Sequence, residues 1–109
     1  MLRHWVTTFV FAAASIALVA AQGCNTVRGL GRMFGFEVIQ DPRFTAKRNT
    51  DIDAKIQAAM AALQQHDMVF VHFKAPDLFA HDREPFGKKE VLERFDAALA
   101  PLMDQPIII

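Results

Sequence analysis

The side chains best suited to chemistry gather in one short stretch, which holds Lys74, Asp77 and His81. Asp77 and His81 are four positions apart, so one helical turn or a tight loop would direct a carboxylate oxygen and an imidazole nitrogen toward a common point. These ligand types suit Mn²⁺ or Zn²⁺, with Mg²⁺ as a further candidate. Lys74 could neutralise a phosphate or carboxylate group bound beside such a metal.

Spacing alone leaves the metal interpretation open. Asp77 and His81 would equally form a surface pair or a helix cap, and Lys74 would equally be a solvated charge at a strand end. A catalytic divalent metal normally takes at least three protein ligands, so two residues would supply only part of a site. His72 lies between apolar neighbours, which favours a hydrogen-bonded core histidine.

These residues follow one of several apolar segments that alternate with segments of helical period. Strands are predicted at residues 13–18, 36–39, 68–73 and 107–109. Helices are predicted at residues 25–34, from Thr50 or Asp51 to residue 63, and at 88–103. This alternation is typical of an α/β fold with a mostly parallel sheet and flanking helices. In such sheets ligands bind beyond the carboxyl ends of the strands, where the lysine, aspartate and histidine are expected.

Each of the two longer predicted helices carries an apolar face. In the first of them the face holds Ile52, Ile56, Ala59, Met60 and Leu63. In the second it holds Val91, Leu92, Phe95, Ala98, Leu99 and Leu102. Pro101 is expected to end or bend this second helix early, because proline cannot continue the helical hydrogen bonding.

Local signals mark the boundaries of the elements. Thr50 and Asp51 are good N-cap residues, and Gly35 follows a predicted helix at a position where φ is often positive. Residues 68–71 lack polar alternation, which predicts a central parallel strand covered on both faces. The polar stretch 40–49 is predicted to be a connecting loop.

The composition narrows the class of protein. The chain has 109 residues, 52% of them hydrophobic, which allows one domain at most and excludes intrinsic disorder. Lys and Arg number 12 against 12 Asp and Glu, and no basic run occurs, so general nucleic-acid binding is excluded. Cys24 is the single cysteine, which excludes a disulfide within the chain and a multi-cysteine zinc site. No histidine is placed to activate it as a nucleophile.

The N-terminal 21 residues can be interpreted in several ways. Arg3 followed by apolar residues 9–20, with Val19 and Ala21 at cleavage positions, would form a signal peptide. Cys24 would suit a lipoprotein signal, although Gln22 fits it poorly. The apolar run is at the lower length limit of a membrane span. Alternatively it is a buried strand followed by the start of a core helix, because such strands are equally apolar.

Three motifs carry a resemblance to a known family. Residues 13–17 and 27–39 are similar to a strand followed by a V-x-G-x-x-R-x-x-G-x-x-V helix and strand. Residues 49–55 are similar to a T-D-x-x-x-K helix start, and residues 70–82 to V-H-x-K-A-P-D-x-x-x-H-D. In this order the motifs resemble the archaeal-type, 2,3-bisphosphoglycerate-independent phosphoglycerate mutases of the alkaline phosphatase metalloenzyme superfamily.

The resemblance implies a reaction and residue roles. The reaction is the interconversion of 3-phosphoglycerate and 2-phosphoglycerate in glycolysis and gluconeogenesis, through a phosphoserine enzyme that uses two divalent metals. Asp77 and His81 match two ligands of one metal, and Lys74 matches the neighbouring lysine, which we expect to contact the small phosphorylated substrate. The resemblance also implies a cytoplasmic protein with no membrane partner.

The chain departs from the family pattern in two respects. Ala80 and Arg83 stand where family members usually have glycine. The family's serine nucleophile has no match, so no catalytic residue is assigned and an incomplete metal site is expected. We therefore expect residues 12–109 to be a fragment of an alkaline-phosphatase-like core, inactive without the remainder of the enzyme, and residues 1–11 stay unassigned. One alternative is a small exported or membrane-tethered α/β binding protein whose residues 1–21 act as a signal. Another is a different phosphotransferase of the same superfamily.

Overall fold

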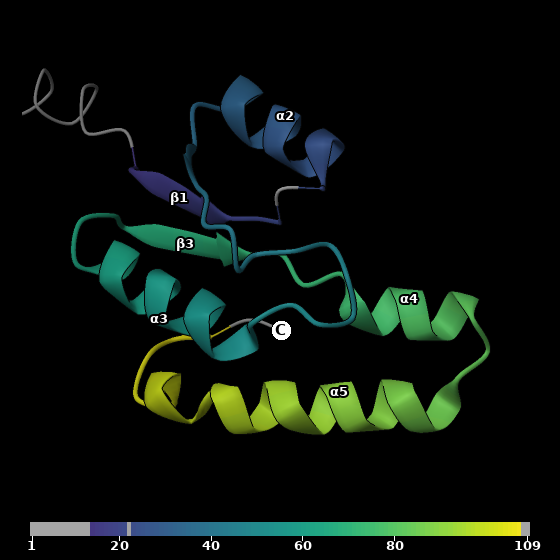
Figure 1. The fold of residues 1–109 in the computed structure, drawn as a ribbon. Helices are drawn as coiled ribbons and strands as arrows, with labels where there is room; N and C mark the ends of the chain where they lie inside the picture. Colours follow the sequence, from purple (N-terminus) through teal and green to yellow (C-terminus); the bar gives the residue numbers. More distant parts are fainter. Residues whose placement is uncertain (1–13, 22, 108–109) are drawn as a thin grey trace, which may run out of the picture.

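The computed structural model describes residues 14–21 and 23–107, and these form a three-stranded parallel sheet with flanking helices (Figure 1). The strands are β1 (Ile16–Val19), β2 (Glu37–Ile39) and β3 (Met68–Val71). The helices are α2 (Asn25–Met33), α3 (Ile52–Leu63), α4 (Ala75–His81) and α5 (Pro85–Ala98), followed by the 3₁₀-helix η1 (Ala100–Leu102). The expected α/β alternation with a parallel sheet is confirmed.

The strand order is β2-β1-β3, and both neighbours run parallel to β1. Leu18 of β1 is level with Val38 on one side and with Phe70 on the other. The prediction that β3 is a covered central strand is wrong for the part of the chain that the structure describes. There β1 is central, while Met68 and Phe70 of β3 are exposed on one face.

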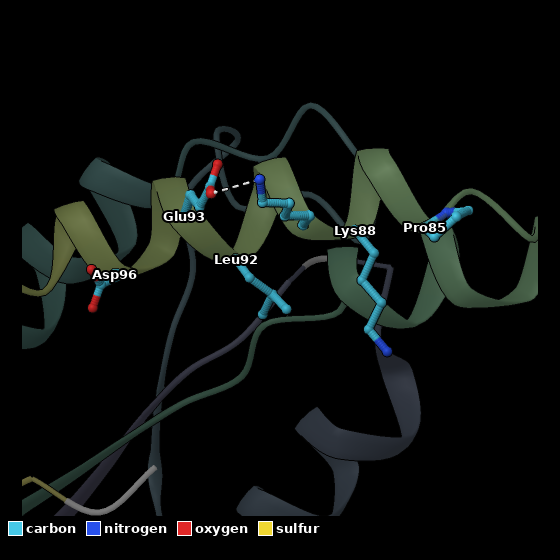
Figure 2. A pocket seen from close by; sticks show the side chains of 6 residues that line it. Pro85, Lys88, Leu92, Glu93 and Asp96 are labelled. Atoms are coloured by element: carbon cyan, nitrogen blue, oxygen red, sulfur yellow. Dashed lines mark ion pairs between the residues drawn. The ribbon is translucent and has the colours of Figure 1, made fainter.

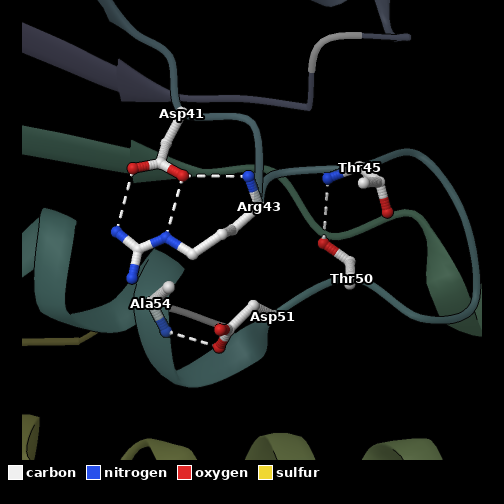
Figure 3. Close-up of polar contacts among 6 residues, drawn as sticks. All are labelled: Asp41, Arg43, Thr45, Thr50, Asp51 and Ala54. Carbon is white, nitrogen blue, oxygen red and sulfur yellow. Dashed lines mark hydrogen bonds and ion pairs between the residues drawn. The ribbon is translucent and has the colours of Figure 1, made fainter.

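Helix α3 covers one face of the sheet and creates the first part of the core. Val19, Phe44, Ala54 and Ala59 are buried together there, with Ile39, Val69 and Val71 packed against them. The side chain of Asp51 accepts a hydrogen bond from the Ala54 amide at 2.9 Å, which confirms the predicted N-cap (Figure 3). Met60, expected on the apolar face, is instead exposed on α3.

The loop at residues 40–49 is polar, but it is anchored to this core by Phe44, which is 1% exposed. Arg43 pairs with Asp41 through Nε and Oδ1 at 2.8 Å, and the amide of Thr45 donates to Oγ1 of Thr50 at 3.2 Å (Figure 3). The buried Thr50 thereby supplies an acceptor for the loop and leads into the first turn of α3. The loop is therefore fixed to the core by Phe44 and to the start of α3 by the Thr45–Thr50 hydrogen bond.

Helix α2 lies on the opposite face of the sheet, directly against β1 (Figure 1). This close approach depends on glycine at position 31, because a Cβ atom there would lie only 2.6 Å from Cδ2 of Leu18. Gly35 ends the helix with a φ of 77°, as its position predicts. The helix covers this face only in part, and a set of large apolar side chains remains exposed, namely Leu30, Met33, Phe34, Met68 and Phe70.

The segment between β3 and α5 holds the helix α4, which was not predicted as an element of its own. Helix α5 begins at Pro85, three positions before the predicted start at residue 88, because proline is well suited to the first helical turn. It ends at Ala98 and passes into η1, which contains Pro101, so the predicted early end is confirmed. A second part of the core joins α3, α4, α5 and η1, and its buried residues are Ile52, Ile56, Ala75, Val91, Ala98, Leu99 and Leu102.

The structure tests only in part the signal peptide suggested for the N-terminal residues and the strand predicted at residues 107–109. Residues 1–13 lie outside the described residues, as do Ile108 and Ile109 of the predicted last strand, and Ile107 has no regular secondary structure. Ala17, Val19, Ala20 and Ala21 are fully buried, so cleavage after Ala21 would remove the central strand of the sheet. Within the described part of the chain, no helix has the length and apolar character needed to span a membrane.

Candidate functional site

The end of β3 and the start of α4 bring together the three residues predicted to do chemistry. Lys74 is the N-cap of α4, and Pro76 in its first turn favours helix initiation directly after the strand. Asp77 and His81 lie one turn apart on α4, with Oδ1 and Nε2 separated by 3.4 Å. The ammonium group of Lys74 donates a hydrogen bond to Oδ2 of Asp77. The expected approach of the Asp77 carboxylate to the His81 imidazole is present, and Lys74 pairs with the same carboxylate, whereas a metal role for these residues stays a prediction.

The charges around Asp77 favour its ionised form. The hydrogen bond from Lys74 lowers the pKa of the Asp77 carboxyl, and the nearby charges of His81 and Lys88 lower it further. The same hydrogen bond raises the pKa of Lys74. The His81 side chain is 77% exposed, so its imidazole is accessible to a ligand. Among the described residues, no group of three or more His, Cys, Asp or Glu side chains is close enough together to hold a metal.

Lys55 also lies at the carboxyl end of the sheet. It is 1% exposed, and its Nζ donates to the carbonyl oxygen of His72 at 3.2 Å. The ring of Phe73 lies 5.7 Å from the same Nζ. Burial lowers the pKa of this ammonium group. The sequence places Lys55 in a motif, but nothing in its helical spacing distinguishes it from an exposed lysine.

His72 differs from the hydrogen-bonded core histidine that the sequence favours. It is half-buried, and its Nδ1 atom is buried without a hydrogen-bond partner among the described residues. Burial lowers the pKa of His72, and the charges of Lys55 and Lys74 lower it further. The imidazole is therefore held in its neutral form at the end of β3.

The first turn of α2 follows the carboxyl end of β1, the central strand of the sheet. Cys24 is the N-cap of α2 and is half-buried. The helix has no side-chain cap and no acidic residue in its first turn. Neither a capping side chain nor a first-turn carboxylate therefore neutralises the positive end of the α2 dipole.

Arg48 connects the loop at 40–49 to the turn between α4 and α5. It forms ion pairs with Asp82 and with Glu84, and its guanidinium lies 4.6 Å from the ring centroid of Phe79. In the same turn Arg83 has a φ of 57°, in the left-handed region that favours glycine. Arg83 is one of the two positions at which the family resemblance leads us to expect glycine, and here an arginine adopts the left-handed conformation.

Two of the surface hollows in the described part of the chain are lined by residues other than Asp77 and His81. One, of about 560 Å³, follows the outer face of α5 (Figure 2) and is lined by Pro85, Lys88, Lys89, Leu92, Glu93 and Asp96. Leu92 was predicted to face the core, but it is exposed in this hollow. The other, of about 300 Å³, lies between α2 and the sheet and is almost wholly apolar, with His72 at its margin. The side chains of Asp77 and His81 lie at the surface of α4, where 46% and 77% of them are exposed.

Comparisons with known proteins point to one family. The sequence profile of the metalloenzyme superfamily matches residues 23–106. A 2,3-bisphosphoglycerate-independent phosphoglycerate mutase 1 of Archaeoglobus fulgidus is 41% identical over 78 residues, which cover 72% of this chain and 19% of that relative. A 2,3-bisphosphoglycerate-independent phosphoglycerate mutase of Methanopyrus kandleri is 40% identical over 77 residues, 71% of this chain and 18% of its own length. This chain thus spans about a fifth of the length of the curated relatives it matches.

The fold comparison agrees with the sequence comparison. A solved protein of Pyrococcus horikoshii superposes with a TM-score of 0.77 at 34% identity, over 85% of this chain and 28% of the other. The similarity thus includes the parallel sheet and the helices around it. Because the superfamily profile matches most of the sequence, the chain belongs to the metalloenzyme superfamily.

Proposed function

We propose that this chain forms part of the catalytic core of a metal-dependent, 2,3-bisphosphoglycerate-independent phosphoglycerate mutase. The enzyme would interconvert 3-phosphoglycerate and 2-phosphoglycerate in glycolysis and gluconeogenesis, in the cytoplasm. The observation that carries the proposal is the 3.4 Å approach of Asp77 Oδ1 to His81 Nε2 at the carboxyl end of β3. It is supported by relatives that are named as mutases of this type.

In this proposal Asp77 and His81 supply two ligands to one divalent metal. Their oxygen and nitrogen donors fit Mn²⁺ or Zn²⁺, and Mg²⁺ to a lesser degree. When bound, such an ion acts as a Lewis acid that stabilises charge on the oxygens of a transferring phosphoryl group. Asp77 is prepared for this role because its lowered pKa keeps the carboxylate ionised. Lys74 contacts the substrate and neutralises part of its negative charge.

The serine nucleophile and the remaining metal ligands would come from parts of the mutase beyond the matched region. Residues 12–109 are accordingly proposed as a partial core domain, while residues 1–11 have no assigned role. Since phosphoryl transfer needs a nucleophile as well as a metal, we expect no mutase turnover from the isolated chain. Metal binding by the isolated chain should be weak, because two ligands hold a divalent ion less firmly than three or four.

A chimeric enzyme tests this function directly. The matched 78-residue stretch of the Archaeoglobus fulgidus relative is replaced by the corresponding stretch of this chain. The chimera should interconvert the two phosphoglycerates, and Asp77→Ala within it should abolish turnover. Asp53→Ala serves as the matched control, because Asp53 is an exposed carboxylate on α3 with no metal role. A folded chimera without turnover, or one that keeps turnover after Asp77→Ala, would contradict the proposal.

A further inference from the structure

One face of the sheet is covered by a helix only in part. Helix α2 lies over β1 on this face, where a Cβ atom at Gly31 would lie 2.6 Å from Cδ2 of Leu18. Phe70 of β3 is level with Leu18 in the parallel register, so both side chains point to the same face. Leu18 is 5% exposed beneath α2, whereas Phe70 is 49% exposed. Within the described part of the chain, the position beside α2 and over β3 therefore has no helix.

A hollow of about 300 Å³ marks this position between α2 and the sheet. Its lining side chains are apolar except for His72 at the margin. The rings of Phe36 and Phe70 stack there with their centroids 5.7 Å apart, and the centroids of Phe34 and Phe36 are 6.1 Å apart. We call this hollow and the exposed apolar side chains that adjoin it the α2–β3 face, and these side chains are Leu30 and Phe34 on α2 and Met68 and Phe70 on β3.

The α2–β3 face has the character of a contact surface. Parallel sheets are normally covered by helices on both faces, and a contiguous exposed apolar patch typically marks an interaction site. Among the described strands β3 pairs only with β1, so its other edge has no strand partner there. The apolar face thus adjoins a sheet edge at which a further strand can pair.

The helices that follow β2 are placed elsewhere. Helix α3 lies on the opposite face of the sheet, where it buries its apolar side against β1 and β3. Helices α4 and α5 pack with α3 in the second part of the core. None of these three helices covers the α2–β3 face. The matched stretch makes up 19% of the Archaeoglobus fulgidus mutase, and this chain covers 28% of the Pyrococcus horikoshii protein, so most of each relative lies outside the shared region.

We propose that the α2–β3 face is an interface with the remainder of the mutase core, which covers it with an apolar helix placed beside α2 and over β3. The identity of this partner rests on the function proposed above. The side chains that enter the hollow are uncharged, because a charge buried there would have no counter-charge among the lining residues. His72 lies at the margin of the hollow and two positions before Lys74, so this contact brings the remainder of the core to the end of β3 that carries the candidate site.

Hydroxyl-radical footprinting read by mass spectrometry tests the interface on the natural side chains, because such radicals oxidise exposed methionine and phenylalanine. The full chain by itself is compared with the chimera described above, in which it replaces the matched stretch of the Archaeoglobus fulgidus relative. Phe34, Met68 and Phe70 should be oxidised in the chain by itself and should lose most of this oxidation in the chimera. Met60 on α3 and Phe86 on α5 are exposed outside the α2–β3 face, so their oxidation should change little.

A substitution at the rim of the hollow measures the same contact by stability. Phe34 is 72% exposed, so Phe34→Glu should leave the melting temperature of the chain by itself nearly unchanged. In the chimera it should lower the melting temperature by about 5 °C or more, because a charge would be buried without a partner. Phe86→Glu is the matched control: Phe86 is 86% exposed on α5, so this substitution should change neither protein.

Several results would overturn the interface. Phe34 and Phe70 would be oxidised equally in the two proteins, or Met60 and Phe86 would be protected as strongly as they are. A chimera that does not fold would show that the remainder of the relative does not accept this face. Protection of Phe34 and Phe70 that grows with the concentration of the chain by itself would assign the face to a second copy.

These outcomes are distinguishable from failure of the mutase proposal, because neither measurement depends on turnover. An active chimera in which Phe34 and Phe70 stay exposed would refute the interface alone. A folded chimera without turnover, in which both rings are protected, would refute the mutase function and leave the interface standing.

Discussion

The Nδ1 atom of His66 lies 2.6 Å from Oγ of Ser15, a residue 51 positions away in the sequence. On the other side of the ring, Nε2 lies 2.8 Å from Oε2 of Glu37, and only 10% of the His66 side chain is exposed. Ser15 precedes β1, Glu37 begins β2, and His66 stands just before β3. One imidazole therefore links all three described strands at their amino ends, opposite the edge that carries Asp77 and His81.

His66→Ala should destabilise the chain by removing both of these contacts. We expect a loss of about 1–2 kcal/mol in the free energy of unfolding, since each net hydrogen bond contributes about 1 kcal/mol. Urea denaturation followed by circular dichroism measures this change. Gln65→Ala is the control, because Gln65 is an exposed neighbour without such contacts, and it should change stability by less than about 0.5 kcal/mol. Equal effects of the two substitutions would show that the imidazole does not link the strands.

Two glycines of α2 should respond in opposite directions to alanine. At Gly31 a Cβ atom would lie 2.6 Å from Leu18 Cδ2, so Gly31→Ala should cost about 1–3 kcal/mol through overpacking. At Gly29 no atom lies within 4 Å of the added Cβ, so Gly29→Ala should stabilise the helix by about 0.5–1 kcal/mol. Thermal unfolding of both variants measures whether the melting temperature falls for Gly31→Ala and rises for Gly29→Ala. A melting temperature raised by Gly31→Ala would contradict the observed packing of α2 on β1.

Ala80 and Arg83, the two positions at which the family resemblance leads us to expect glycine, should respond in opposite directions to substitution by glycine. Arg83 has a φ of 57°, so Arg83→Gly should relieve a left-handed conformation and stabilise the chain by about 1 kcal/mol. Ala80 lies within α4, so Ala80→Gly should destabilise it by about 0.5–1 kcal/mol. Chemical denaturation of the two variants measures whether the free energy of unfolding rises in the first and falls in the second. Destabilisation by Arg83→Gly would mean that the arginine side chain contributes more than the backbone conformation costs.

Local signals in the sequence predict much of this fold. The strand and helix alternation, the Asp51 cap and the positive φ of Gly35 each depend on a few adjacent residues, and all three are observed. Helix α4 has seven residues, too few for a helical period to show. The position of β3 at one side of β1 depends on how the crossover helices pack, which residues 68–71 do not encode by themselves.

In the candidate site, too, the residues that are close in the sequence could be predicted, and those brought together by the fold could not. Asp77 and His81 could be found because their spacing of four places them on one face of a helix, and Lys74 because it adjoins them. Lys55 could not, since its contact with the His72 carbonyl oxygen joins α3 to the end of β3, two elements that are distant in the sequence. The Ser15, His66 and Glu37 contacts likewise join residues far apart in the sequence.

The lowered pKa of His72 predicts an acid-sensitive fold. The unfolded chain titrates this imidazole near its ordinary value of 6.5, whereas the folded chain takes up the proton only at lower pH. Between these two values the unfolded state binds more protons, so stability should fall as the pH decreases from 6.5 through the folded pKa. His72→Gln should reduce this loss. Denaturation curves at several pH values between about 7 and 4 compare the two proteins, and identical pH profiles would contradict the prediction.

The lowered pKa of Lys55 has its consequence at alkaline pH. Burial disfavours the charged ammonium, so between the folded pKa and the ordinary value of 10.5 the unfolded state again binds more protons. The contribution of Lys55 to stability should therefore rise as the pH increases through this interval. Lys55→Met cannot titrate, so the stability difference between the natural chain and the variant should shift in favour of the natural chain with increasing pH. Thermal unfolding of both proteins from neutral pH to 10.5 measures this difference, and Lys89→Met corrects for the loss of one surface charge. A difference that stays constant across the interval would mean that the Lys55 ammonium group is as well solvated in the folded chain as in the unfolded one.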